Sequence, residues 1–167
     1  MTEDEMKVPL APRASSEGAR RTMIANRRRD TKPELLIRRA LHASGLRYRV
    51  DYAPLASDRR RRADIVFTRA KVAVFVDGCF WHGCPTHFVM PKSNVDYWAP
   101  KIQRNMARDA ETTHRLEDGG WTVLRFWEHE DPAIAAVRIM DKVASAGQRR
   151  NAERDAEVPI SHNAKGR

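Results

Sequence analysis

Two short β-branched runs joined by a tight connection constrain the fold of this chain more than any other feature. Residues 63–68 read ADIVFT and residues 71–76 read KVAVFV. Val, Ile and Phe favour extended backbone, and two such runs with a short link predict a β-hairpin. The run TVLRFW at residues 122–127 predicts a further strand, and the alternating basic and apolar residues at 47–52 predict an edge strand.

Helices are predicted before, between and after these strands. Thr31 and Glu34 have the spacing of a capping box, and Gly45 ends the helix that they begin. A long helix is expected over residues 100–118, and a last helix from 131 to about 146, where Asp-Pro marks the start. This order predicts an α/β sandwich, in which a small mixed sheet is flanked by helices on both faces.

The length of 167 residues suits one compact domain. We expect that domain to span residues 20–146, between disordered tails at 1–19 and 147–167. No apolar run is long enough for a bilayer, and the start of the chain lacks the pattern of a secretory signal. A cytoplasmic protein without a membrane partner is therefore expected.

Positive charge is concentrated in one part of the chain. Residues 13–62 contain 15 Lys or Arg against 5 Asp or Glu, whereas the whole chain has a net charge of +9. A one-sided excess favours a polyanionic partner such as nucleic acid. The alternative is a surface whose charge serves only solubility.

Three residues could form a hydrolytic site. Asp64 opens an apolar strand beside a run of arginines, where a carboxylate could hold a divalent cation against a phosphodiester. His82 follows the hairpin and could act as a general base. Asp109 interrupts the apolar stripe of the long helix, so it must be paired or face a polar cavity. The alternative for Asp64 is pairing with one of its neighbouring arginines, and for Asp109 it is structural pairing.

The segment after the hairpin, VDGCFWHGCPTH, also has the residues of a metal site. Cys79, Cys84 and His87 are spaced for tetrahedral zinc, and His129, just past a predicted strand, is the candidate for the fourth ligand. Buried free thiols are the alternative, since a disulfide is unusual in a reducing cytosol. Phe80 and Trp81, in the same glycine-flanked loop, either wedge between DNA bases or anchor the loop.

From about residue 21 to 128 the chain resembles the very-short-patch repair (Vsr) DNA mismatch endonucleases. The matching segments are RRTMIANRRRDTKPE, RRADIVF, FVDGCFWHGC, YWAPKIQRNMARD and GWTVLRFWE. The resemblance implies a restriction-endonuclease-like core, a Mg²⁺ requirement and structural zinc. It also implies nicking 5′ of the T in a T·G mismatch of double-stranded DNA, the product of 5-methylcytosine deamination. The resemblance further implies a nucleoid-associated monomer that is functionally linked to a cytosine-5 methyltransferase.

The resemblance also implies roles for individual residues. Asp64 and the main-chain carbonyl of Val76 look like the Mg²⁺ ligands, His82 like the catalytic base, and Glu34 and Asp109 like supporting acidic residues. The expected zinc ligands are Cys79, Cys84, His87 and His129. The residues expected to enter the DNA stack are Met23, Phe80 and Trp81. The residues expected to contact the DNA backbone are Arg27, Arg28, Arg59, Arg60, Arg61 and Arg62.

Three departures from the family pattern are visible. Val76-Asp77 stands where some members have Thr-His, so Asp77 adds negative charge near the metal. His129 stands where the family pattern admits a Cys, and the E-x-K of many related nucleases is absent. The rival hypotheses are a restriction-like nuclease without mismatch preference and a zinc-stabilised DNA-binding protein without catalysis. The combination of His82, Asp64, Glu34 and Asp109 favours an enzyme.

Overall fold

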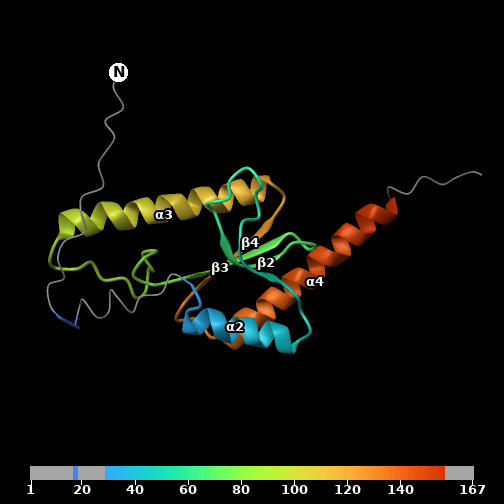
Figure 1. Cartoon of the computed structure of the whole chain (residues 1–167), viewed down its shortest axis with the longest axis horizontal. Helices are drawn as coiled ribbons and strands as arrows, with labels where there is room; N and C mark the ends of the chain where they lie inside the picture. Colours follow the sequence, from blue (N-terminus) through green and yellow to red (C-terminus); the bar gives the residue numbers. More distant parts are fainter. Residues whose placement is uncertain (1–16, 19–28, 157–167) are drawn as a thin grey trace, which may run out of the picture.

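The structure is a computed structural model that describes residues 17–18 and 29–156 (Figure 1). Helices and strands alternate along the chain in nearly the predicted order. In sequence the elements are α2 (Lys32–Ala43), β1 (Arg49–Tyr52), β2 (Ala63–Phe67), β3 (Val72–Asp77), α3 (Val95–Asp118), β4 (Thr122–Trp127) and α4 (Pro132–Ala156). The predicted hairpin is confirmed, because β2 and β3 pair antiparallel and place Ile65 opposite Val74.

The four strands form one mixed sheet in the order β1-β2-β3-β4. β1, β2 and β3 are antiparallel neighbours, whereas β4 runs parallel to β3. A parallel pair needs a crossover connection, and α3 supplies it. The register of this pair sets Phe75 opposite Arg125 and Asp77 opposite Trp127.

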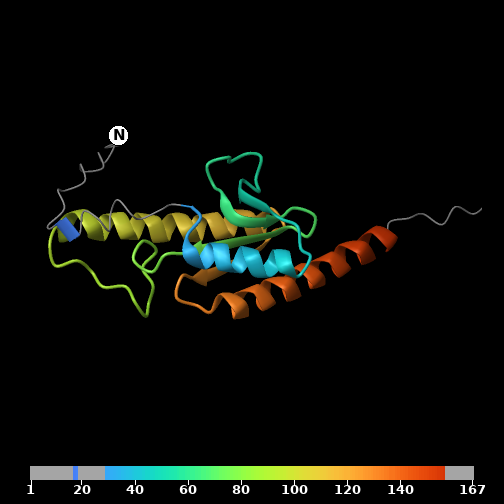
Figure 2. The same ribbon diagram turned by 60° about the horizontal axis from the view of Figure 1, so that its bottom comes forward.

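Helices cover both faces of the sheet, as predicted. In Figures 1 and 2, α3 crosses one face while α2 and α4 lie together on the other. The α2/α4 side is the larger core, where Leu41, Ile65 and Ile139 are fully buried. On the α3 side, Val66 and Leu116 are buried in a second cluster. The prediction of an α/β sandwich with a small mixed sheet is therefore confirmed.

Two helix boundaries differ from the sequence-based expectation. α3 begins at Val95, and Pro100 lies inside it instead of starting it. Tyr97, Trp98 and Ile102 are buried on this part of the helix. The packing of these side chains outweighs the hydrogen bond that a proline removes near a helix N-terminus.

The second difference is at the other end of the domain. α4 continues to Ala156, so the expected end near residue 146 and a disordered tail from residue 147 are wrong for this stretch. Ala146 is still buried, but the turns beyond it extend away from the sheet (Figure 1). Within the described residues, no helix has the length and apolar character needed to cross a membrane.

Candidate active site

Asp64 lies where β2 and β3 separate. The ladder between these strands ends at Ile65 and Val74. Beyond it, Oδ2 of Asp64 accepts a hydrogen bond of 2.7 Å from the backbone N–H of Val76. Within the described part of the chain this is the carboxylate's only hydrogen bond, which leaves Oδ1 available to a ligand.

The electrostatic surroundings of Asp64 are those of a carboxylate that lacks a cation. Burial, together with the charges of Glu34 and Asp77, raises the pKa of Asp64 to about 7 against the opposing effect of the Val76 hydrogen bond. A carboxylate withdrawn from water in this way is stabilised in its charged form by a nearby positive ion. The side chain and the neighbouring backbone of Val76 therefore fit a Mg²⁺ site.

Glu34 is the most buried acidic side chain described, with 2% of its surface exposed. Its Oε2 accepts hydrogen bonds from the backbone N–H groups of Asp30 (2.9 Å) and Thr31 (3.4 Å), at the start of α2. Its Oε1 lies 2.8 Å from Nη1 of Arg38. Both oxygens are thus engaged within the protein, so Glu34 acts on Asp64 through its charge and by fixing the start of α2.

His82 and Asp109 form a hydrogen-bonded pair between the loop after β3 and the middle of α3. Nδ1 of His82 lies 2.5 Å from Oδ2 of Asp109. Burial lowers the pKa of His82, but the hydrogen bond to Asp109 and the charges of Asp77 and Asp109 raise it to a net value above its usual range. Because Asp109 accepts at Nδ1, the Nε2 atom is left to take a proton. The structure thus brings two predicted site residues together.

Arg125 of β4 joins this pair, although the sequence analysis did not single it out. Its guanidinium lies between the carboxylates of Asp77 and Asp109. A cavity of about 210 Å³ borders the group, and its lining residues are Asp77, His82, Met106, Asp109, Arg125, Phe126 and Trp127. The sequence predicted that Asp109 either is paired or faces a polar cavity. In the structure it is paired and also lines a cavity.

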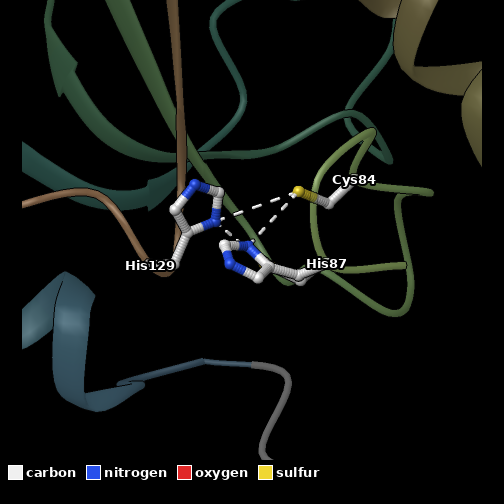
Figure 3. A group of neighbouring side chains, drawn as sticks. Cys84, His87 and His129 are labelled. Carbon is white, nitrogen blue, oxygen red and sulfur yellow. Dashed lines mark hydrogen bonds between the residues drawn. The ribbon is translucent and has the colours of Figure 1, made fainter. Parts of the chain in front are cut away.

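The four expected zinc ligands converge on one point. The ligand atoms of Cys79, Cys84, His87 and His129 all lie within 4.8 Å of one another. Sγ of Cys79 is 3.1 Å from Nδ1 of His129, and Sγ of Cys84 is 3.9 Å from Nδ1 of both His87 and His129. Figure 3 shows the two imidazoles and the Cys84 thiol pointing toward one another.

These distances fit a tetrahedral metal ion. With metal–ligand bonds of about 2.0–2.3 Å, neighbouring N and S ligands of zinc are separated by roughly 3.5 Å. Both cysteines are free and buried, and burial together with the neighbouring Cys84 raises the pKa of the Cys79 thiol. Two thiols brought together out of water are the donor set that a cation such as zinc would complete.

Gly83 lies between the two groups of site residues and permits their arrangement. Its φ of +65° is in the left-handed region, and a Cβ at this position would come within 2.7 Å of Sδ of Met106. Only glycine satisfies both conditions without strain. The loop can therefore place His82 beside Asp109 and Cys84 in the cluster of expected zinc ligands.

Phe80 and Trp81 belong to an aromatic cluster at the start of α3. Phe80 makes edge contacts with Trp81 (5.1 Å between ring centroids) and with Trp98 (5.3 Å). Nζ of Lys101 lies 5.5 Å from the Trp81 ring and 5.4 Å from the Trp98 ring. Phe80 and Trp81 are half-buried, so each both anchors the loop and keeps part of its ring at the surface. Trp98 and Lys101 were not predicted as members of this group.

The four arginines of the basic run differ from one another. Arg61 pairs with Asp58 (2.8 Å) and Glu111 (2.7 Å). Arg62 pairs with Asp51. Arg59 and Arg60 are exposed. Met23, Arg27 and Arg28, which were expected to contact DNA, lie outside the described residues.

Comparison with known proteins identifies the family. The family model described as DNA mismatch endonuclease Vsr matches residues 15–87. The type II nicking enzyme V.NaeI of Lentzea aerocolonigenes is 47% identical over 131 residues, which are 78% of this chain and 79% of the relative. The type II nicking enzyme V.NmeDIP of Neisseria meningitidis serogroup C is 42% identical, over 71% of this chain and 78% of the relative. DNA mismatch endonuclease Vsr of Escherichia coli K12 is 35% identical, over 65% and 67%.

The chain belongs to the Vsr DNA mismatch endonuclease family. It is therefore a DNA endonuclease, and the hypothesis of a DNA-binding protein without catalysis is wrong. The mixed sheet flanked by helices agrees with the restriction-endonuclease-like core expected of Vsr proteins. DNA is the substrate of this Vsr endonuclease, and two groups of its side chains have the spacing of metal sites.

Proposed function

We propose that this endonuclease nicks one strand of duplex DNA 5′ of the T in a T·G mismatch, such as arises by deamination of 5-methylcytosine. Two observations carry the proposal: Asp64 is a partly buried carboxylate with one hydrogen bond among the described residues, and His82 is paired with Asp109. The charges of Asp77 and Arg125, which contact the His82–Asp109 pair, also act on Asp64. The names of the relatives, nicking enzymes and a mismatch endonuclease, support the same reaction.

In this proposal Asp64 and the Val76 carbonyl hold Mg²⁺. When bound, the ion neutralises charge on the phosphodiester and lowers the pKa of a water molecule. Asp109 holds His82 through Nδ1, so that Nε2 faces the reaction with a free lone pair and accepts the proton of the attacking water. Glu34 supports the site from the start of α2.

Recognition of the mismatch is assigned to the aromatic cluster. A wobble pair is stacked less well than a matched pair, so it is easier to open by insertion of an aromatic side chain. Phe80 and Trp81 present partly exposed rings, supported from behind by Trp98. Met23 is proposed to assist. Arg27 and Arg28, with the exposed Arg59 and Arg60, would bind the phosphates.

We further propose that zinc held by Cys79, Cys84, His87 and His129 stabilises the loop that carries His82. The enzyme is proposed to act as a monomer on the chromosome, alongside a cytosine-5 methyltransferase whose product creates the mismatch on deamination. Light scattering of the free and DNA-bound protein tests the monomer.

A panel of end-labelled duplexes tests the reaction itself. It contains T·G, every other mismatch and the matched pairs, each with and without Mg²⁺. We expect a single nick 5′ of the T, in T·G duplexes and with Mg²⁺ only. The variant Asp64→Asn should not nick but should bind DNA nearly as well as the wild type, because phosphate contacts dominate affinity. Equal cutting of matched duplexes would instead show a restriction-like nuclease, and wild-type nicking by Asp64→Asn would remove Asp64 from the site.

A further inference from the structure

Arg125 is held in one orientation by contacts with all three guanidinium nitrogens. Nε and Nη2 form two parallel bonds to the carboxylate of Asp77, at 2.7 and 2.9 Å. Nη2 also lies 3.2 Å from Oδ1 of Asp109. Nη1 donates to the backbone carbonyl of Asp109 and to Oγ1 of Thr113. The guanidinium lies 4.6 Å above the ring of Phe75, which faces it across the β3–β4 pair.

Two carboxylates compete for the same nitrogen of His82. Nδ1 is 2.5 Å from Oδ2 of Asp109 and 3.5 Å from Oδ1 of Asp77. Arg125 engages both oxygens of Asp77 but only Oδ1 of Asp109. The remaining oxygen of Asp109 is thus the acceptor left for His82, and the imidazole is turned toward α3.

The guanidinium also supplies the positive charge that this acidic group requires. Ligand atoms of Asp77, His82 and Asp109 lie within 4.8 Å of one another, the spacing of a metal site. Two carboxylates so close together cannot both remain ionised without a cation beside them. Arg125 provides that charge from within the protein, with the fixed fork geometry that a lysine lacks.

We propose that Arg125 is a positioning residue for the nicking reaction. It holds Asp77 and Asp109 so that Asp109 alone orients His82, with Nδ1 protonated and Nε2 open. The inference rests on the proposed function, in which His82 takes the proton of the attacking water. Arg125 itself acts only through the two carboxylates.

The test compares Arg125→Met with the matched control Arg138→Met in the full-length, zinc-loaded protein. Arg138 also pairs with an acidic side chain, Glu130, and lies 4.9 Å above an aromatic ring, that of Phe126. It belongs to α4, and within the described residues these contacts do not involve His82 or the carboxylates beside it. The measurements are the melting temperature, the affinity for a T·G duplex, the single-turnover nicking rate and the nitrogen chemical shifts of the His82 ring.

We expect Arg125→Met to lower the nicking rate by about 10- to 100-fold at nearly unchanged affinity, the usual effect of a misplaced catalytic group. Because either carboxylate can then accept the Nδ1 hydrogen bond, the single set of His82 ring signals should become two sets or a broadened one, as expected for two ring orientations. Arg138→Met should alter neither. An unchanged His82 spectrum in Arg125→Met, whatever its rate, would overturn the positioning role, and so would a wild-type rate.

A double variant separates positioning from general loss of structure. Adding Asp77→Asn to Arg125→Met removes the carboxylate that the first change leaves unpaired, so Asp109 should again be the sole anionic partner of His82. We expect the single set of His82 ring signals and at least part of the rate to return. A double variant no better than Arg125→Met would contradict the proposal.

Two further variants keep the test decisive. If Arg125→Met does not fold, Arg125→Lys retains the charge without the fork, and its nicking rate and His82 ring signals are interpreted in the same way. His82→Ala examines the proposed function separately. Wild-type nicking by His82→Ala would refute the role of His82 as base, whereas the ring spectrum of Arg125→Met would still report whether Arg125 orients it.

Discussion

Nδ1 of His82 and Oδ2 of Asp109 are 2.5 Å apart, although one residue lies in a loop after a strand and the other in the middle of a 24-residue helix. The pair fixes which ring nitrogen of His82 carries a proton. It also adds negative charge beside the imidazole, which favours the protonated ring. The pH dependence of cutting should therefore report this contact directly.

We expect the nicking rate to rise with pH through a value above 6.5, the ordinary pKa of histidine, because neutral His82 is the active form and its pKa is raised. Asp109→Asn removes the charge that raises the pKa, so the rise should move to lower pH while the maximal rate falls. Single-turnover rates between about pH 5 and 9 at saturating Mg²⁺ measure both effects. An unshifted pH profile in Asp109→Asn would contradict the assignment.

Asp64 should destabilise the Mg²⁺-free protein above neutral pH. Its pKa is about 7 in the folded protein and 3.8 ordinarily. The folded form therefore binds a proton that the unfolded chain has lost, and the stability from this proton is full below 3.8 and lost as pH rises to about 7. We expect Asp64→Asn to raise the free energy of unfolding by roughly 2–4 kcal/mol at alkaline pH, since one pKa unit is about 1.4 kcal/mol.

Urea unfolding of the zinc-loaded protein without Mg²⁺ measures this difference. Near about pH 4 the two proteins should be similar, because Asp64 is then largely protonated in both states. A variant that is less stable than the wild type above neutral pH would show that the carboxylate of Asp64 has a positive partner already.

Zinc analysis should find about one ion per chain, since structural zinc sites bind tightly. Cys84→Ala and His129→Ala should each lose the ion and lower the free energy of unfolding by about 3 kcal/mol or more. His114, exposed on α3, provides the control, because His114→Ala removes a histidine outside the cluster. Full occupancy in His129→Ala would place the fourth ligand elsewhere, and absence of zinc from the purified wild type would leave two buried thiols.

Trp81→Ala should weaken binding to a T·G duplex by about 1–3 kcal/mol, the contribution of one stacked base, and should barely affect the matched duplex. Titration of both labelled duplexes measures the difference. Trp121, which packs in the core on the α3 side of the sheet, supplies the control Trp121→Phe. Equal losses on both duplexes, with a lowered melting temperature, would identify Trp81 as a loop anchor only.

The basic run should separate into two functional halves. Replacing the exposed Arg59 and Arg60 by Ala should weaken both duplexes alike and reduce the salt dependence of binding by up to about 2 in the log–log slope. Arg61→Ala should instead lower stability, because Arg61 connects Asp58 to Glu111 of α3. A larger loss of DNA affinity for Arg61→Ala than for the exposed pair would contradict this division.

Local sequence signals were sufficient for most of the fold. The β-branched runs predicted β2, β3 and β4, and the Thr31–Glu34 spacing predicted the start of α2. Pro100 led to a wrong prediction of the start of α3, because the conformational preference of one residue competes with the burial of its neighbours. The end of α4 also lacked a clear stop signal, since Gly147 can be accommodated in a helix at a modest cost.

Site residues could be predicted where they lie close together in one segment of the sequence. They could not be predicted where only the pairing of distant strands brings them together. Cys79, Cys84 and His87 lie within nine residues of one another, so their spacing alone indicated a metal site. Arg125 gave no such signal, because an isolated arginine in a strand is typical of a solvent-facing position. Only the parallel register, which places Arg125 opposite Phe75 and thus near Asp77, shows its partner.

Under the proposed mechanism, the pairing of β3 with β4 also sets when the enzyme can first cut DNA during its own synthesis. Asp64 and His82 leave the ribosome well before Arg125 and His129, which lie in and just after the last strand. A pairing between segments so far apart in the chain closes late, because the long connection between them, which includes α3, must first be ordered. If Arg125 orients His82 as proposed, the nascent chain emerges with His82 in no fixed orientation, and nicking begins only once β4 is in place.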